Sequence, residues 1–158
     1  MVEKQKDSPN INKNVHPPFV ALFYIVVAMV LQRFVPIPFE VPAAGRYIGL
    51  GMTAIGFLLG IGAFIEFRKA RTTLDPHGSV KALVTDGIYR FTRNPIYLGF
   101  FLMVIGFPLN SGSLWGFIAA PFYLTTMSRL VIEKEEAYLE KKFKERYTGY
   151  RSRVRRWL

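Results

Sequence analysis

The chain has 158 residues, a length typical of one domain, and 51% of them are apolar although the formal net charge is +10. It contains no cysteine, which excludes disulfides, a thiolate nucleophile and thiolate metal ligands. The two histidines, His16 and His77, lie in different segments, so we expect no metal site. No charged residue occurs from Asn94 to Ser128, whereas ten Lys or Arg follow. Because the basic residues flank apolar runs, we expect their partner to be the membrane lipid bilayer and not nucleic acid.

Four apolar runs follow a polar, proline-containing tail at residues 1–18, which we expect to be flexible. The first run has a second interpretation, as a cleaved signal peptide. The third run is short, and at about 1.5 Å per residue it reaches roughly 22 Å, less than a hydrocarbon core of about 30 Å. The sequence predicts an all-α fold, an integral membrane bundle of four transmembrane helices with an amphipathic C-terminal helix in the cytoplasm. The expected spans are residues 19–35, 47–67, 95–109 and 114–132, and the expected C-terminal helix is 133–150, all in one domain at 19–158.

The positive charges predict how this bundle is oriented. The connection at 66–93 carries six Lys or Arg and the C-terminal segment carries ten, whereas the opposite side would carry only Arg33 and Arg46. Lys and Arg accumulate on the cytoplasmic side of membrane proteins. We therefore expect a multi-pass integral membrane protein with both termini in the cytoplasm.

Glycines in the second span indicate close helix packing. Gly56 and Gly60 have the spacing that lets two membrane helices approach without side chains between their backbones. Gly49, Gly51 and Gly62 add to this surface of small residues. We expect the second span to pack closely against another helix.

A polar cluster stands directly before the third span, in the stretch FTRNPIYLGF at 91–100. Asn94 suits the N-cap of a helix whose first residue is Pro95. A cap does not explain why two arginines and two tyrosines gather there as well, and a helix N-terminus also attracts anions. The residues of this cluster are candidates for a binding site: Tyr89, Arg90, Arg93, Asn94 and Tyr97.

The C-terminal segment places ionisable residues on its apolar face. If it forms one continuous helix, Arg129 and Glu136 fall on the apolar stripe and Glu135 lies to one side. One interpretation is an ion pair between Arg129 and Glu136 that holds two helices together. The other is a polar pocket at the membrane boundary, because ionisable groups turned toward an apolar interior are often functional. An amino acid head group would suit such a pocket, with its carboxylate near the arginines and its ammonium near the glutamates.

Two motifs in this order, ALVTDGIYRFTRNPIYLG and EKEEAYLEKKFKERYTGYRSRV, resemble the integral-membrane methyltransferases that include isoprenylcysteine carboxyl methyltransferase and the phospholipid N-methyltransferases. The resemblance covers roughly residues 47–158. It implies S-adenosylmethionine as the methyl donor, bound in a cytoplasm-facing pocket, and a lipidic acceptor that enters from the bilayer. It also implies that Glu135 holds the donor, whereas the helical wheel favours Glu136. The donor contacts that it implies are Lys81, Ala82, Leu83, Val84, Tyr89, Asn94, Pro95, Ile96, Tyr97 and Glu135, to which the charge argument adds Arg90.

The acceptor is not fixed by the resemblance. The carboxyl methyltransferases have His at the position of Asn94 and a substrate-contacting Arg at the position of Val131. The acceptor group therefore stays open between a carboxylate and an amine, and an amine would need a base, for which Glu136 is the candidate. The candidate catalytic residues are Arg93, Arg129 and Glu136. The alternative function is a non-catalytic membrane protein that binds a lipid or a partner helix, and the sequence predicts no oligomeric state.

Overall fold

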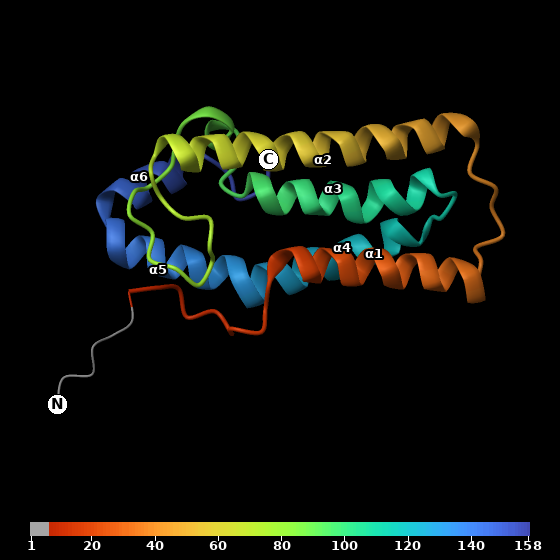
Figure 1. Cartoon of the computed structure of the whole chain (residues 1–158), viewed down its shortest axis with the longest axis horizontal. Coiled ribbons are helices and arrows are strands. Elements are labelled where there is room, and N and C mark those ends of the chain that lie inside the picture. Colours follow the sequence, from red (N-terminus) through yellow and green to blue (C-terminus); the bar gives the residue numbers. More distant parts are fainter. Residues whose placement is uncertain (1–6) are drawn as a thin grey trace.

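The fold is a bundle of long helices that lie along one axis (Figure 1). The computed structural model describes residues 7–158, and these residues form helices and no strand, which confirms the all-α prediction. In chain order the elements are α1 (Pro17–Phe34), α2 (Ala43–Lys69), the short 3-10 helix η1 (Gly87–Arg90), α3 (Pro95–Asn110), α4 (Trp115–Met127), the π-helical turn η2 (Ser128–Ile132), α5 (Glu133–Phe143) and α6 (Glu145–Arg153).

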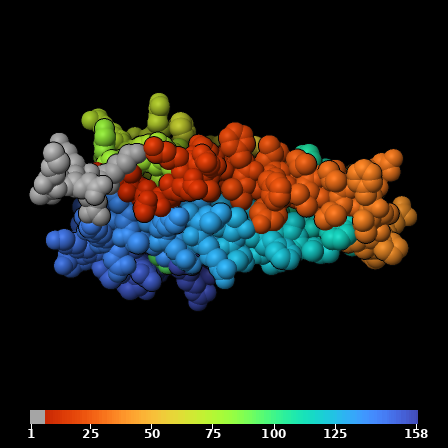
Figure 2. All heavy atoms as spheres, turned by 90° about the horizontal axis from the view of Figure 1, so that it is seen from below, coloured from red at the N-terminus to blue at the C-terminus, as the bar shows by residue number. Residues whose placement is uncertain are grey.

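Helix α3 lies at the centre of the bundle. It packs against α2 on one side and against α1 and α4 on the other, and α1 also contacts α4. Seen from below, α1 and the stretch from α4 to α5 lie side by side along the molecule (Figure 2). The connection at 70–94 lies at the same end of the bundle as α5 and α6 (Figure 1). Polar segments from distant parts of the sequence are therefore gathered at one end. The largest fully buried side chains between the helices include Val104, Tyr123, Met127 and Ile132.

Glycines bring the backbones of α2 and α3 into direct contact. A Cβ atom added to Gly56 would lie 2.6 Å from the carbonyl oxygen of Gly99, and one added to Gly49 would lie 2.6 Å from that of Gly106. The two glycines of each helix are about two helical turns apart, so both face the partner helix. Close packing of the second span was predicted correctly. The prediction that Gly60 belongs to this contact was wrong, because a Cβ atom added to Gly60 would have no neighbouring atom within 4 Å.

Two helices are long and apolar enough to cross a membrane, α1 with 18 residues and α2 with 27. Only 17% of the apolar window in each helix is buried, whereas the core helix of a soluble protein would be mostly buried. The exposed surface of these helices carries large apolar side chains, among them Phe19, Phe23, Phe57 and Phe64. Apolar surface of this extent marks a region that another apolar phase or partner covers. Helix α3 is apolar but shorter, so the third and fourth spans stay predictions.

The C-terminal segment is not the single helix that we expected at 133–150. Helix α4 runs through η2 into α5, but the helix breaks at Lys144, whose φ of 46° lies in the left-handed region, and α6 follows. A π-helical turn holds about one residue more than an α-helical turn, so it rotates the residues after it by about 100° relative to those before it. This rotation separates Arg129 from Glu136, which a regular helix would place on one face.

The segment before α1 has no regular structure but packs against the rest of the chain. The Ile11 side chain is buried, and the Asp7 carboxylate binds Lys142 of α5. Of the tail that we expected to be flexible, residues 1–6 lie outside the described residues, and α1 already begins at Pro17. The remainder, 7–16, is held by specific contacts.

Candidate functional site

A cavity lies at the end of the bundle where the connection between α2 and α3 meets α5 and α6. Counting its open mouth, the space between its lining atoms is about 810 Å³. Its walls come from the N-terminal segment, the 73–84 connection, η1, the first turn of α3, α5 and α6. The lining residues that matter below are Pro9, Leu83, Val84, Tyr89, Arg93, Asn94, Ile96, Tyr97, Glu135, Leu139, Tyr147 and Tyr150.

Glu135 lies in the wall of this cavity. Its Oε1 accepts a hydrogen bond of 2.7 Å from the Tyr97 hydroxyl, and no Lys or Arg within residues 7–158 forms an ion pair with it. Burial raises the pKa of Glu135 to about 7; the hydrogen bond from Tyr97 opposes this rise, and the charge of Glu136 adds to it. A carboxylate that lines a cavity without a cation partner would be stabilised by a cationic ligand.

Glu136 lies outside the cavity and joins two arginines. Arg156 binds it through two hydrogen bonds, from Nη2 to Oε2 at 2.6 Å and from Nε to Oε1 at 3.1 Å. Arg93 Nη1 lies 2.9 Å from the same Oε1. Glu136 is 8% exposed, so these ion pairs are largely shielded from water. We define Arg93, Glu136 and Arg156 as the ionic cluster.

The structure corrects two expectations that came from the helical wheel. Glu135 lines the cavity and Glu136 does not, although the wheel favoured Glu136. The expected ion pair between Arg129 and Glu136 is wrong, because Glu136 pairs with Arg93 and Arg156 while Arg129 is exposed and outside the cavity. The second difference follows from η2, which interrupts the regular helix that the wheel assumes between Arg129 and Glu136. Both glutamates lie after η2 in α5, and the break at Lys144 changes how α6 is placed relative to them.

Asn94 stands at the start of α3, as predicted, but its side chain does not cap the helix. It occupies the N-cap position without a side-chain cap hydrogen bond. Instead its Nδ2 donates to the backbone oxygen of Arg156 at 2.9 Å, and the Thr92 hydroxyl donates to the same oxygen at 3.1 Å. The backbone N–H of Arg93 donates to the oxygen of Arg155 at 3.0 Å. The stretch FTRNP is therefore fixed to the C-terminal segment of the chain.

Most of the predicted donor contacts meet at the cavity, and three do not. Lys81 is exposed, Arg90 pairs with Asp86 on the surface at 3.1 Å, and Pro95 is buried inside the protein. Arg93, expected as a catalytic residue, lies in the cavity wall. The predicted donor contacts that line the cavity are Ala82, Leu83, Val84, Tyr89, Asn94, Ile96, Tyr97 and Glu135.

Tyr147 and Tyr150, which belong to the apolar face of the C-terminal segment, also line the cavity and are not among the predicted contacts. The Tyr147 hydroxyl accepts a hydrogen bond of 3.0 Å from Arg93 Nη1, and the Tyr150 hydroxyl donates to the backbone oxygen of Tyr89 at 2.7 Å. Burial raises the pKa of both tyrosines, so their hydroxyls stay neutral. Two phenols within an apolar stripe were the available signal, because a buried hydroxyl needs a hydrogen-bond partner.

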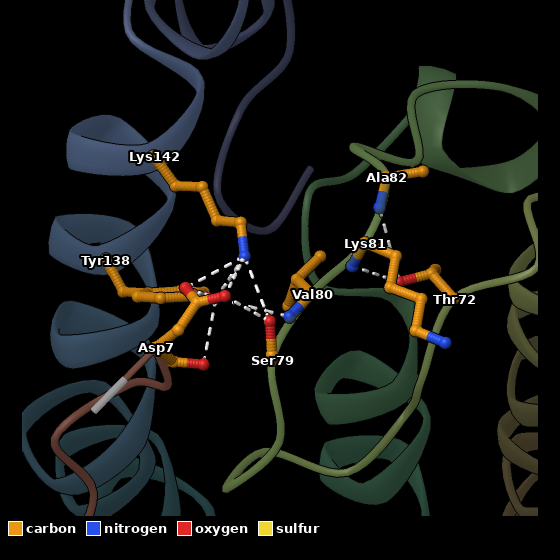
Figure 3. Close-up of polar contacts among 8 residues, drawn as sticks. All are labelled: Asp7, Thr72, Ser79, Val80, Lys81, Ala82, Tyr138 and Lys142. Atoms are coloured by element: carbon orange, nitrogen blue, oxygen red, sulfur yellow. Dashed lines mark hydrogen bonds and ion pairs between the residues drawn. The ribbon is translucent and has the colours of Figure 1, made fainter.

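One wall of the cavity is tied to the N-terminal segment (Figure 3). Lys142 Nζ lies 2.8 and 2.7 Å from the two carboxylate oxygens of Asp7, and the Tyr138 hydroxyl donates to one of them at 2.9 Å. The Ser79 hydroxyl donates to the same carboxylate, which connects the α2–α3 connection to α5. The hydrogen bond from Lys142 is the main reason that the pKa of Asp7 is lowered to about 2. Pro9, two residues further on, lines the cavity.

Comparison with known proteins identifies the family. A sequence model of the phospholipid methyltransferase family matches residues 45–146, which is more than half of the chain. The chain belongs to this family. The part that matches the phospholipid methyltransferase family contains every site residue that we predicted from the sequence. It does not include Arg156 or the N-terminal segment.

Two relatives extend the comparison. The chain is 38% identical over 72 residues to the protein-S-isoprenylcysteine O-methyltransferase of Schizosaccharomyces pombe, a match that covers 46% of this chain and 30% of that protein. It is 32% identical over 63 residues to an uncharacterized protein of Haemophilus influenzae, which covers 40% of this chain and 100% of that protein. No solved structure matches the chain. The match thus spans less than a third of the length of the Schizosaccharomyces pombe methyltransferase.

Proposed function

We propose that the chain is an S-adenosylmethionine-dependent methyltransferase that acts on a lipidic or membrane-partitioned acceptor at the cytoplasmic face of a membrane. The observation that carries the proposal is Glu135, a carboxylate in the cavity wall without a cationic partner among residues 7–158. Membership of the phospholipid methyltransferase family and the name of the Schizosaccharomyces pombe relative support the reaction class.

The residues around the cavity fit the charges of the donor. Glu135 would accept hydrogen bonds from the donor ammonium, because within residues 7–158 its carboxylate has only Tyr97 as a hydrogen-bond partner. Arg93 lies in the same wall, and its Nε is buried without a hydrogen-bond partner within the described part of the chain. It would face the donor carboxylate. Leu83, Val84 and Ile96 supply apolar wall for the remainder of the molecule.

When bound, the donor would supply a methyl group on a sulfonium, whose carbon–sulfur bond breaks, releasing a neutral thioether, as the acceptor bonds to the methyl carbon. The protein then needs to hold the two reactants in line and to exclude water. The Tyr147 and Tyr150 hydroxyls are occupied by Arg93 and Tyr89, so the cavity wall that they form is fixed before the donor binds. Both oxygens of Glu136 already accept hydrogen bonds from guanidinium groups. We therefore assign Glu136 to positioning and not to the base that an amine acceptor would need.

The proposed membrane arrangement has four spans, with α1 and α2 as the two helices long enough by themselves. Helix α3 would form the third span, and α4 with η2 would form the fourth. The cavity end of the bundle carries the connection at 66–93 and the C-terminal segment, which hold most of the Lys and Arg. The positive-inside bias favours a cytoplasmic position for this end and for both termini.

Calorimetry tests donor binding with protein purified in detergent. We expect S-adenosylmethionine and S-adenosylhomocysteine to bind the unaltered chain and to bind Glu135→Gln at least about tenfold more weakly. Glu40→Gln is the matched control, since it removes an exposed carboxylate from the α1–α2 connection at the opposite end of the bundle. If neither nucleoside binds the unaltered chain, the methyltransferase proposal fails and the non-catalytic alternative takes its place.

A second experiment identifies the acceptor. Transfer of a radioactive methyl group from S-adenosylmethionine is measured in vesicles that contain either a prenylated cysteine analogue or phosphatidylethanolamine. Label in the first assigns a carboxylate acceptor and label in the second an amine acceptor. Val131, at the position of the substrate-contacting Arg of the carboxyl methyltransferases, is fully buried in the helix core, so this chain offers no cation there. Label in neither lipid argues against both acceptor classes.

A further inference from the structure

The ionic cluster carries a net positive charge beside the cavity. It contains two arginines, Arg93 and Arg156, and one carboxylate, Glu136, so one positive charge is left over. Arg156 takes both oxygens of Glu136, whereas Arg93 shares only Oε1 and also donates to Tyr147. Without Arg156 the remaining pair, Arg93 and Glu136, would be neutral.

Arg156 also fixes the backbone that carries Arg93. Its carbonyl oxygen accepts hydrogen bonds from the Thr92 hydroxyl and from Asn94 Nδ2, at 3.1 and 2.9 Å. These two residues flank Arg93 in the sequence. One residue of the C-terminal segment therefore contacts both neighbours of Arg93 and the carboxylate with which Arg93 pairs.

We infer that Arg156 is a positioning residue for the donor site, and that it leaves Arg93 with the charge that attracts the donor carboxylate. The Arg156 guanidinium compensates the negative charge of Glu136, so that Glu136 does not neutralise Arg93. The Arg156 backbone oxygen holds the FTRNP stretch in place. Arg156 does not line the cavity, so it acts through Arg93 and not by contact. The inference rests on the proposed function, because it concerns the head group of the proposed donor.

Two nucleosides separate this role from a general structural one. S-adenosylhomocysteine has the amino acid head group, whereas 5′-methylthioadenosine lacks it and keeps the adenosine and the sulfur. Calorimetry measures the affinity for each nucleoside in the unaltered chain and in three variants, Arg156→Gln, Arg156→Lys and Arg153→Gln. The last is the matched control, because Arg153 is exposed and its Nε donates to the Gly149 oxygen within its own helix. Thermal unfolding of each variant is measured in the same detergent.

We expect Arg156→Gln to lower the affinity for S-adenosylhomocysteine by about tenfold. The substitution removes a positive charge that acts at short range in a site partly shielded from water. The affinity for 5′-methylthioadenosine should stay within about twofold. Arg156→Lys keeps the charge but not the paired hydrogen bonds, so it should restore most of the lost affinity. Arg153→Gln should leave both affinities unchanged.

Unchanged affinity of Arg156→Gln for S-adenosylhomocysteine would overturn the inference. An equal loss for both nucleosides would also overturn it, because that result indicates a collapsed cavity and not a missing charge. If Arg156→Gln does not fold, Arg156→Lys decides the question, since an affinity for S-adenosylhomocysteine within about threefold of the unaltered chain supports the role of the charge, and a loss of about tenfold or a loss shared by both ligands overturns it. Failure of the unaltered chain to bind either nucleoside would reject the proposed function instead.

Discussion

Replacing Glu135 by Gln should have opposite effects on stability and on donor affinity. The carboxylate has a pKa raised from 4.5 to about 7 by its burial, so its ionised form destabilises the unliganded protein above pH 7. One pKa unit corresponds to about 1.4 kcal/mol, so the shift corresponds to at most about 3–4 kcal/mol. Gln keeps an oxygen that can accept the hydrogen bond from Tyr97 but has no charge. We expect the unliganded variant to be more stable by about 1–3 kcal/mol at pH 8.

The sign of this effect can be followed with pH. Glu135 is neutral in the folded and the unfolded chain below pH 4.5, and it is ionised in both well above pH 7. The advantage of the variant should therefore be largest at pH 8 and should fade as the pH falls through 7 toward 4.5. Thermal unfolding of the purified protein, without nucleoside, measures it as a shift of a few degrees in Tm.

Glu136→Gln is the contrasting variant at the neighbouring position. It removes the partner of two arginines, and breaking a buried ion pair from one side is destabilising by about 3–5 kcal/mol. The two glutamates should thus move the Tm in opposite directions. Loss of stability in Glu135→Gln at pH 8, or an equal change at pH 5 and pH 8, would contradict the assignment of Glu135 as the unpaired carboxylate of the cavity.

Three further predictions follow from the contacts described above. Donor affinity should rise about tenfold between pH 6 and pH 8, because Glu135 must be ionised to hold an ammonium, and calorimetry should find this dependence absent in Glu135→Gln. Gly99→Ala should lower the Tm, since its Cβ would lie 2.6 Å from the Gly56 oxygen, whereas Gly60→Ala should leave the Tm unchanged or raise it. Equal Tm values for the two variants would contradict the α2–α3 contact. Asp7→Asn should speed amide hydrogen exchange in residues 73–80, and Glu40→Gln should not. If these amides stay protected in Asp7→Asn, the contacts of Asp7 with Ser79 and Lys142 do not order this connection.

The positions of the long helices could be predicted because they depend on local sequence. An apolar run bounded by proline and polar residues gave α3 at 95–109, and the helix occupies Pro95–Asn110. The first run gave 19–35, and α1 occupies Pro17–Phe34. Helix α2 begins at Ala43 and not at residue 47, where the uncharged run starts, because a helix at a membrane surface can carry a charge such as that of Arg46.

The features that could not be predicted depend on breaks in helical geometry and on distant contacts. Nothing in the composition around Ser128 marks a π-helical turn, and Lys144 is neither Gly nor Asn, the residues that usually adopt a positive φ. The helical wheel therefore continued through both positions and favoured Glu136, whereas Glu135 lines the cavity. The hydrogen bonds from Arg156 to Glu136 and from Lys142 to Asp7 join residues that no local periodicity relates. The resemblance indicated Glu135, which lines the cavity, because it compared whole motifs and needed no helical phase.

The cavity is assembled from distant parts of the chain, and this determines when it can form. Pro9 and Tyr150 both line it, so nearly the whole chain between them is closed into one loop. Closing such a loop loses entropy before the contacts compensate, which makes the step slow. Helices α3 and α4, joined by the short turn at 111–114, need no such closure. We therefore expect folding to pass through a state with a formed helical hairpin and no cavity. Ligand binding would then be the last property that the chain acquires on folding and the first that it loses on heating.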